Sequence, residues 1–234
     1  MSKVGRQSTS EIEPMLDQCT RNLMFSFAMS FFAATACLGQ SSTYLKINVA
    51  DILTVDVPSH WHVRDLSERQ NIAAAGEAIS DGLRRKDEAM HVSSLSVVSR
   101  PEPTGAIIRV SLIAIEETSQ ATLNEEIRVD RAAVLQDVMN VFKEDMVTLR
   151  QVMQKQGMKI LDQEQVGIES IGGQTAFTLR YRRTSAVGDS PFTVVQFHIP
   201  RGRQKVLITL SYRESDGRLF GNILEHVRRS VTFL

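Results

Sequence analysis

A succession of short strands and tight turns fills the last third of this 234-residue chain and limits the fold more than any other feature. The pattern predicts strands at 159–169, 174–182, 192–199 and 204–213. The turns between them are Gly172-Gly173, Gly188-Asp189-Ser190-Pro191 and Pro200-Arg201-Gly202. Because strands joined by such short turns pair antiparallel, we expect a meander.

Two helices are expected beside this meander. The apolar face of the helix 216–229 consists of Phe220, Ile223, Leu224 and Val227, at helical spacing. A longer helix, 122–156, begins at a capping box of Thr122 and Glu125. Val138 and Phe142 lie in the middle of its apolar stripe and are expected to be its most buried residues. At about 50 Å this helix is longer than a ten-residue strand, so either its excess length protrudes or its first turns are loop.

The first half of the chain adds strands at 44–49, 52–57, 91–99 and 106–116 and a helix at 67–85. Residues 106–116 are apolar on both faces, so this strand is expected to be central and covered on both sides. The apolar C-terminus, 231–234, is expected to dock on the sheet. Together the elements predict an α+β fold, one twisted antiparallel sheet flanked by helices.

Residues 23–38 form an uncharged apolar stretch that follows Arg21 and ends in small residues, as in a secretion signal. The stretch is shorter than the roughly 20 residues that a membrane span needs. We therefore predict a signal over 1–36, a short tether over 37–43 and one domain over 44–234. The domain would work outside the cytoplasm, in the periplasm or cell envelope. An uncleaved signal anchor is the alternative.

Cys37 is the predicted lipidation site. Ala34-Thr35-Ala36-Cys37 resembles a bacterial lipobox, whose cysteine is acylated and becomes the mature N-terminus. Lipoboxes prefer Leu where this chain has Ala34. The residues that follow, 39–42, form a small polar tether of the kind that follows a lipidated cysteine. Ordinary signal-peptidase cleavage after Ala36 is the alternative.

Charge and cysteine content exclude several classes of function. Lys and Arg total 27, as do Asp and Glu, and the sequence has no basic stripe of the kind that binds nucleic acid. Both cysteines, Cys19 and Cys37, lie in or beside the leader, so the domain has no disulfide, thiolate nucleophile or cysteine-ligated zinc. The sequence carries no nucleotide-binding or hydrolase motif, and we predict no cofactor.

Two groups of side chains could carry chemistry. His60 and His62 are separated by one residue, and alternation along an extended chain would place both imidazoles on one side, where they could ligate zinc or copper. The alternative is that both histidines lie at the rim of the domain and bind no metal. Arg180, Arg182 and Arg183 could bind an anion, although Arg180 and Arg182 are also the polar face of an alternating strand.

Three local motifs resemble the PsbP-like superfamily. They are Val55-Asp56-Val57-Pro58-Ser59-His60-Trp61, Ile171-Gly172-Gly173-Gln174-Thr175-Ala176, and an ending of strand, helix and Ser230-Val231-Thr232-Phe233. The resemblance covers roughly 44–234 and departs at 117–157, which is longer than the family's usual helix. It implies an α/β/α sandwich and a binding or assembly role, since members are mostly without known catalysis and many are exported or lipidated.

The main hypothesis is an exported, membrane-tethered, non-catalytic protein that binds or assembles with a protein partner in the cell envelope. It would contact the membrane only through an N-terminal lipid or an uncleaved signal. One alternative is a small exported metal-dependent hydrolase that uses His60 and His62. Another is an intracellular chaperone of the same fold.

Overall fold

The computed structural model describes residues 43–80, 92–101, 104–162, 165–185 and 190–234, and Thr43–Leu234 form one compact unit. The strands are β1 (Tyr44–Val49), β2 (Leu53–Pro58), β3 (His62–Val63), β4 (Leu95–Val98), β5 (Ala106–Thr118), β6 (Gln165–Ile171), β7 (Gln174–Arg183), β8 (Phe192–Arg213) and β9 (Thr232–Phe233). The helices are α2 (Leu66–Ser80), α3 (Gln120–Lys155) and α4 (Gly217–Ser230), with a 3-10 turn at Glu214–Asp216.

Two antiparallel sheets build this unit. The larger has the strand order β3-β4-β5-β8-β7-β6, and the smaller has the order β1-β2-β9. The α+β class with antiparallel pairing is confirmed, as is the central place of β5. The expectation of a single sheet is wrong, because β2 pairs with β9 at the C-terminus, from Leu53 opposite Phe233 to Thr54 opposite Thr232.

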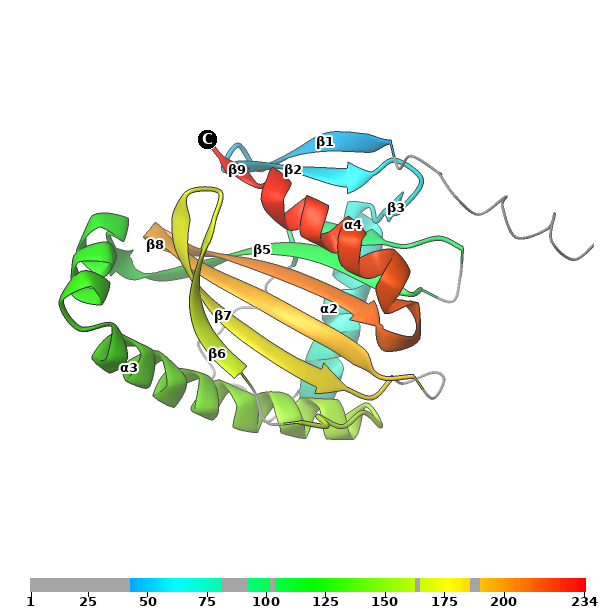
Figure 1. The fold of residues 1–234 in the computed structure, drawn as a ribbon. Coiled ribbons are helices and arrows are strands. Elements are labelled where there is room, and N and C mark those ends of the chain that lie inside the picture. Colours follow the sequence, from blue (N-terminus) through cyan, green and yellow to red (C-terminus); the bar gives the residue numbers. More distant parts are fainter. Residues whose placement is uncertain (1–42, 81–91, 102–103, 163–164, 186–189) are drawn as a thin grey trace, which may run out of the picture. The chain divides into compact units, whose positions relative to one another are not determined.

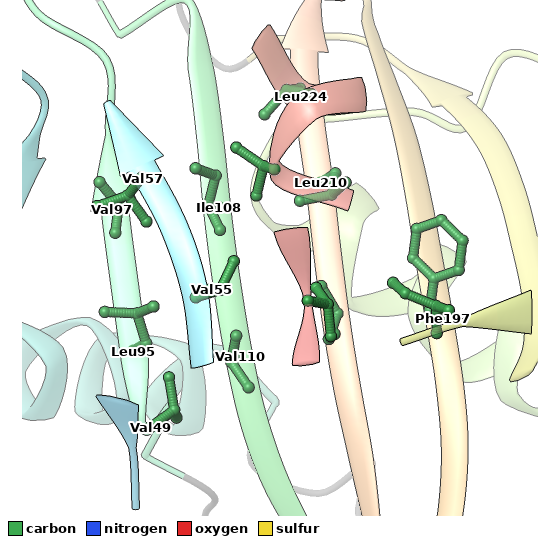
Figure 2. Close-up of a cluster of buried hydrophobic side chains, with 14 of the residues drawn as sticks. Val49, Val55, Val57, Leu95, Val97, Ile108, Val110, Phe197, Leu210 and Leu224 are labelled. Carbon is green, nitrogen blue, oxygen red and sulfur yellow. The ribbon is translucent and has the colours of Figure 1, made fainter. Parts of the chain in front are cut away.

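The larger sheet lies between two layers (Figure 1). On one face, α4 and the smaller sheet enclose the main core, and Figure 2 shows Val55 and Val57 of β2 among the side chains of β4 and β5. The predicted stripe of α4 is confirmed, since Phe220, Ile223, Leu224 and Val227 are its buried residues. On the other face, α3 packs against β7 and β8 through a second, smaller apolar cluster. Each apolar side chain so buried contributes about 1.5–3 kcal/mol to stability.

Glycines occupy two of the turns that the sequence predicts, and residues 188–189 of the third turn lie outside the described residues. Gly172 and Gly173 have φ of 55° and 77° between β6 and β7, values that suit a two-residue hairpin turn. A Cβ at Gly172 would lie 2.8 Å from the carbonyl oxygen of Val231, so the turn also packs tightly against the C-terminus. Gly202 has φ of 62°, and β8 doubles back there, so that its first half pairs with β7 and its second with β5 (Figure 1).

Helix α3 is broken near its start. Asp130 has non-helical dihedral angles (φ −148°, ψ 83°), and its carboxylate accepts a hydrogen bond from the Ala133 amide at 2.9 Å, as a new N-cap does. Before the break, the Gln120 side chain donates to the carbonyl oxygens of Thr175 (3.1 Å) and Pro200 (2.7 Å). The expectation that excess helix protrudes is therefore wrong, because the first turns bend back and bind the end of the sheet.

Two further expectations for α3 are corrected by side-chain contacts. The N-cap is Ser119, whose hydroxyl accepts from the Ala121 amide at 3.2 Å, and the Glu125 carboxylate pairs with Arg128 in place of a capping box. Phe142 is buried as expected, but Met146 and Leu123 are the other buried residues of α3, and Val138 is only half-buried.

Element ends differ from the sequence pattern at two places. Strand β6 starts at Gln165, and upstream of it Ile160 makes only an isolated bridge to Arg183. Residues 81–85 of the predicted helix 67–85 lie outside the described residues, and so does His91 at the start of the predicted strand 91–99.

The packing of α3 generates a stability prediction. Phe142 is 5% exposed, whereas its neighbour Val141 is 59% exposed. Phe142→Ala should lower the free energy of unfolding by about 3–5 kcal/mol, because it opens a cavity under the helix. Val141→Ala should change it by about 0.5 kcal/mol or less. Denaturant unfolding measures both, and equal losses would mean that α3 packs through another face.

Candidate functional site

A groove of about 310 Å³ runs between α4 and the larger sheet. Its apolar lining comes from β8 and α4: Val195, Phe197, Leu210, Tyr212 and Leu224. Figure 2 shows Leu224 of α4 beside Leu210 of β8 at this boundary. The backbone of Gly221 opens the groove, since a Cβ built there meets no atom within 4 Å. The groove volume lies at the lower end of the range of ligand sites.

The rim of the groove is charged. Arg228 donates to both carboxylate oxygens of Glu225, at 2.8 and 2.7 Å, and lies 3.9 Å from Glu169. The hydrogen bond from Arg228 is the main reason that the pKa of Glu225 is lowered to about 2, and Arg229 adds to the effect. Both carboxylates are therefore matched by positive charge.

Arg180 is the unmatched charge of this rim. It lines the groove from β7 and is exposed, and in the described part of the chain its guanidinium forms no ion pair or hydrogen bond. A guanidinium free to bind has five N–H donors in a rigid fork. The groove thus combines an apolar floor with one available cation.

Arg182 belongs to a closed network at one end of the groove. It donates to Glu214 at 2.5 and 2.7 Å and to Asp162 at 2.8 Å, while the Thr193 hydroxyl donates to Glu214 at 3.0 Å. The hydrogen bonds to Glu214 and Asp162 raise the pKa of Arg182, and the same contact lowers the pKa of Glu214. This network ties β7 to the turn before α4.

The three arginines predicted as one anion site therefore lie in three environments. Arg180 faces the groove and Arg182 is held by two carboxylates. Arg183 packs on the opposite face of the sheet, where its guanidinium lies 4.9 Å from the ring centroid of Phe192. Adjacent strand residues point to opposite faces, which separates Arg183 from Arg182.

His60 and His62 do not lie on an extended chain, which the sequence analysis assumed in placing both imidazoles on one side. The Trp61 amide donates to the Pro58 carbonyl at 3.0 Å, so a turn precedes β3, and His60 is exposed in it. His62 Nε2 lies 2.9 and 3.0 Å from the two carboxylate oxygens of Glu68. Trp61 is buried, as expected, and meets Phe220 edge-on at 5.7 Å.

The described ranges contain neither a metal-binding cluster nor a membrane-spanning helix. Within them, no group of three or more His, Cys, Asp or Glu side chains could hold a metal ion. Among the helices they contain, none has the length and apolar character that a membrane crossing requires. Cys37 and the predicted signal lie outside the described residues.

Most of the residues that line the groove do not stand out in the sequence. Glu225, Arg228 and Arg229 stand at i, i+3 and i+4 on the polar face of α4, a spacing that could have indicated a charged cluster. Glu169 comes from β6, which only the folded sheet brings near α4. Nothing in the sequence around Gly221 indicates its role. The residue contributes only the open space where a side chain would stand.

Among the described residues, His198 of β8 is a strongly perturbed titratable group. It is 8% exposed, packs 4.6 Å from the ring of Phe142, and its Nε2 lies 3.3 Å from Gln196 Oε1. Its Nδ1 is buried without a hydrogen-bond partner. Burial, and secondarily the charge of Lys205, lowers the pKa of His198 to about 3. The imidazole is therefore neutral and fills the interface under α3.

The sequence matches no protein-family model and no curated protein. Several solved structures are similar to it. A cyanobacterial PsbP (CyanoP) from Synechocystis is 15% identical, with a TM-score of 0.48 over 86% of this chain and 99% of that chain. LpqN, involved in cell envelope biogenesis of Mycobacterium tuberculosis, is 12% identical, with a TM-score of 0.40 over 82% of this chain and 90% of that chain.

The Ran-binding protein Mog1p of Saccharomyces cerevisiae is also 12% identical, with a TM-score of 0.39 over 82% of this chain and 95% of that chain. A PsbP is among these structures. Likeness at this level concerns the arrangement of helices and strands and assigns no activity, because function resides in sites carried by a fold.

The low pKa of His198 should make the free energy of unfolding depend on pH. Its folded pKa of about 3 lies below the ordinary unfolded value, so the unfolded chain binds the proton more tightly and stability falls as the pH drops below about 6.5. Lowering the pH from about 7 to about 5 should cost about 2 kcal/mol through this group. Urea unfolding of His198→Gln should lack that contribution, whereas the exposed His60→Gln should keep it. Equal pH slopes in wild type and His198→Gln would contradict the assignment.

Proposed function

We propose that this protein is an exported, lipid-tethered, non-catalytic binding protein, whose groove beside α4 receives a segment of a protein partner. The segment would place an apolar side chain on the groove floor and an acidic side chain against Arg180. The observation that carries the proposal is the free guanidinium at the edge of an apolar groove. Such a combination resembles an interface anchor, in which Arg and apolar pockets supply most of the binding energy.

The electrostatics of the rim support binding over acid–base chemistry. A general acid needs a carboxyl group whose pKa is raised toward neutrality. Glu225 and Glu214 have pKa values shifted the opposite way, by Arg228 and Arg182 respectively. These carboxylates stay ionised and bonded, which keeps the rim rigid and suits recognition of a partner.

Tethering follows from the predicted lipid on Cys37. The described unit begins at Thr43, and six residues of chain reach about 20 Å at most. An acylated Cys37 would therefore keep the groove close to the membrane surface, where envelope proteins are its available partners. One acyl chain gives only reversible membrane binding, and a lipoprotein with two or more is held more firmly.

Acylation of Cys37 can be tested by metabolic labelling. We expect radiolabelled palmitate to enter the full-length protein in its native host and to be absent from Cys37→Ala. Cys19→Ala is the matched control, since Cys19 is the other cysteine of the chain and should be labelled like wild type. Equal labelling of Cys37→Ala, or an unblocked mature N-terminus at another residue, would contradict the lipid anchor.

The groove can be tested by filling it. Gly221→Phe should occupy the open space beside α4, while Gly221→Ala should leave the groove open and add helix propensity of about 1 kcal/mol. Arg180→Glu should repel an acidic partner, with Arg203→Glu as a control at an exposed site away from the groove. We expect a partner captured from the envelope fraction by wild type and both controls to be lost from Gly221→Phe and Arg180→Glu. Equal recovery with all variants would contradict the groove as the binding site.

A further inference from the structure

Two ion pairs cross the groove beside α4. At one end, Arg228 of α4 lies 3.9 Å from Glu169 of the edge strand β6. At the other end, Arg182 of β7 donates at 2.7 Å to Glu214, in the turn that leads into α4. Glu169 is opposite Ala176 of β7, and the stretch of β7 from Ala176 to Arg182 spans about 20 Å. The groove therefore lies between two fixed crossings at this separation.

Arg180 lies between these crossings, and no carboxylate of the described chain pairs with it. It is opposite Val195 of β8, and both side chains line the groove. The Cβ atoms of directly opposed residues are about 4.5–5.5 Å apart, so the cation stands beside the apolar floor. On the side of α4, a Cβ built at Gly221 meets no atom within 4 Å. The middle of the groove thus offers one guanidinium, an apolar surface and open space.

A ligand of this middle section needs a carboxylate and an apolar group close together. Along an extended segment, consecutive side chains point to opposite sides, and side chains two residues apart are separated by about 6.6 Å. The last residue of a chain carries its carboxylate and its side chain on the same Cα atom. It therefore matches the adjacent positions of Arg180 and Val195 better than an internal pair of side chains does.

The crossings also restrict the path of a bound chain. A segment that continued along the groove in both directions would have to pass over the pair of Arg228 and Glu169 at one end. At the other end it would have to pass over the pair of Arg182 and Glu214. A chain that ends in the groove can enter between the two pairs and passes over neither. The groove is therefore suited to the end of a chain and not to a segment that runs through it.

We propose that the groove binds the C-terminus of its partner, with the terminal carboxylate on Arg180 and the apolar side chain of the last residue on the floor at Val195. The site depends on the function proposed above, in which the groove receives a protein partner, and the terminal carboxylate takes the place of an acidic side chain at Arg180. A guanidinium fork binds the two oxygens of a carboxylate bidentately. Capture of a C-terminal carboxylate is a recurring mode of peptide recognition.

Fluorescence anisotropy with short N-terminally labelled peptides tests the site on the full-length protein in uncharged detergent. The first peptide ends in leucine with a free carboxylate, the second is its C-terminal amide, and the third is an amide with a glutamate two residues before an internal leucine. Wild type should bind the first at least about tenfold more tightly than the second, which corresponds to about 1.4 kcal/mol. Arg180→Gln should remove most of that difference. Arg203→Gln is the matched control and should keep it, because the Arg203 side chain is 83% exposed and pairs with Glu117.

Filling the groove separates this site from the proposed function. Gly221→Phe should abolish binding of the first peptide, whereas Gly221→Ala should preserve it. If the third peptide binds as tightly as the first and Gly221→Phe abolishes both, the groove stands as the partner site and the terminal carboxylate is overturned. If wild type binds no peptide, the terminal carboxylate is also overturned, and capture of the envelope partner by Gly221→Phe still decides the proposed function. Binding of the first peptide that is unchanged in both Arg180→Gln and Gly221→Phe would overturn the terminal carboxylate and the groove together.

Discussion

The pairing of β5 with the second half of β8 is the constraint on which the rest of the domain depends. The register runs without interruption from Ala106 opposite Tyr212 to Ala114 opposite Gln204. Because side chains alternate along a strand, this register sends Ala106 and Ile108 to the main core and Arg109 to the other face. A shift of one residue would exchange the two sets and bury Arg109 under α4, so the register is strongly specified.

The same register makes the two faces of the sheet chemically different. The main core is completed by α4 and by the smaller sheet, which the C-terminal strand β9 closes against β2. The opposite face carries Arg109, Ser96 and Tyr181, and α3 packs on it through Phe142 and Met146. The groove is built on strands and a helix, which hold side chains more precisely than loops do.

The strands, the turns and α4 could be predicted from the chain because their causes are local. The alternation of β7 and the positive φ of Gly172 and Gly173 follow from neighbouring residues. The break of α3 at Asp130 could not be predicted in this way, because the first turns bend toward acceptors on Thr175 and Pro200. Helix propensity favours a straight helix, and those distant contacts outweigh it.

The chain by itself determined its class of fold, its apolar stripes and its turns, because side-chain period and glycine placement are properties of consecutive residues. Only the tertiary structure decided which charged groups meet. Arg180, Arg182 and Arg183 are neighbours in sequence, yet one faces the groove, one is bound by Glu214 and one lies across the sheet. Arg64 and Arg109 are far apart in sequence, and both adjoin Ser96 of β4. Electrostatic interaction depends on distance through space, which no linear pattern records.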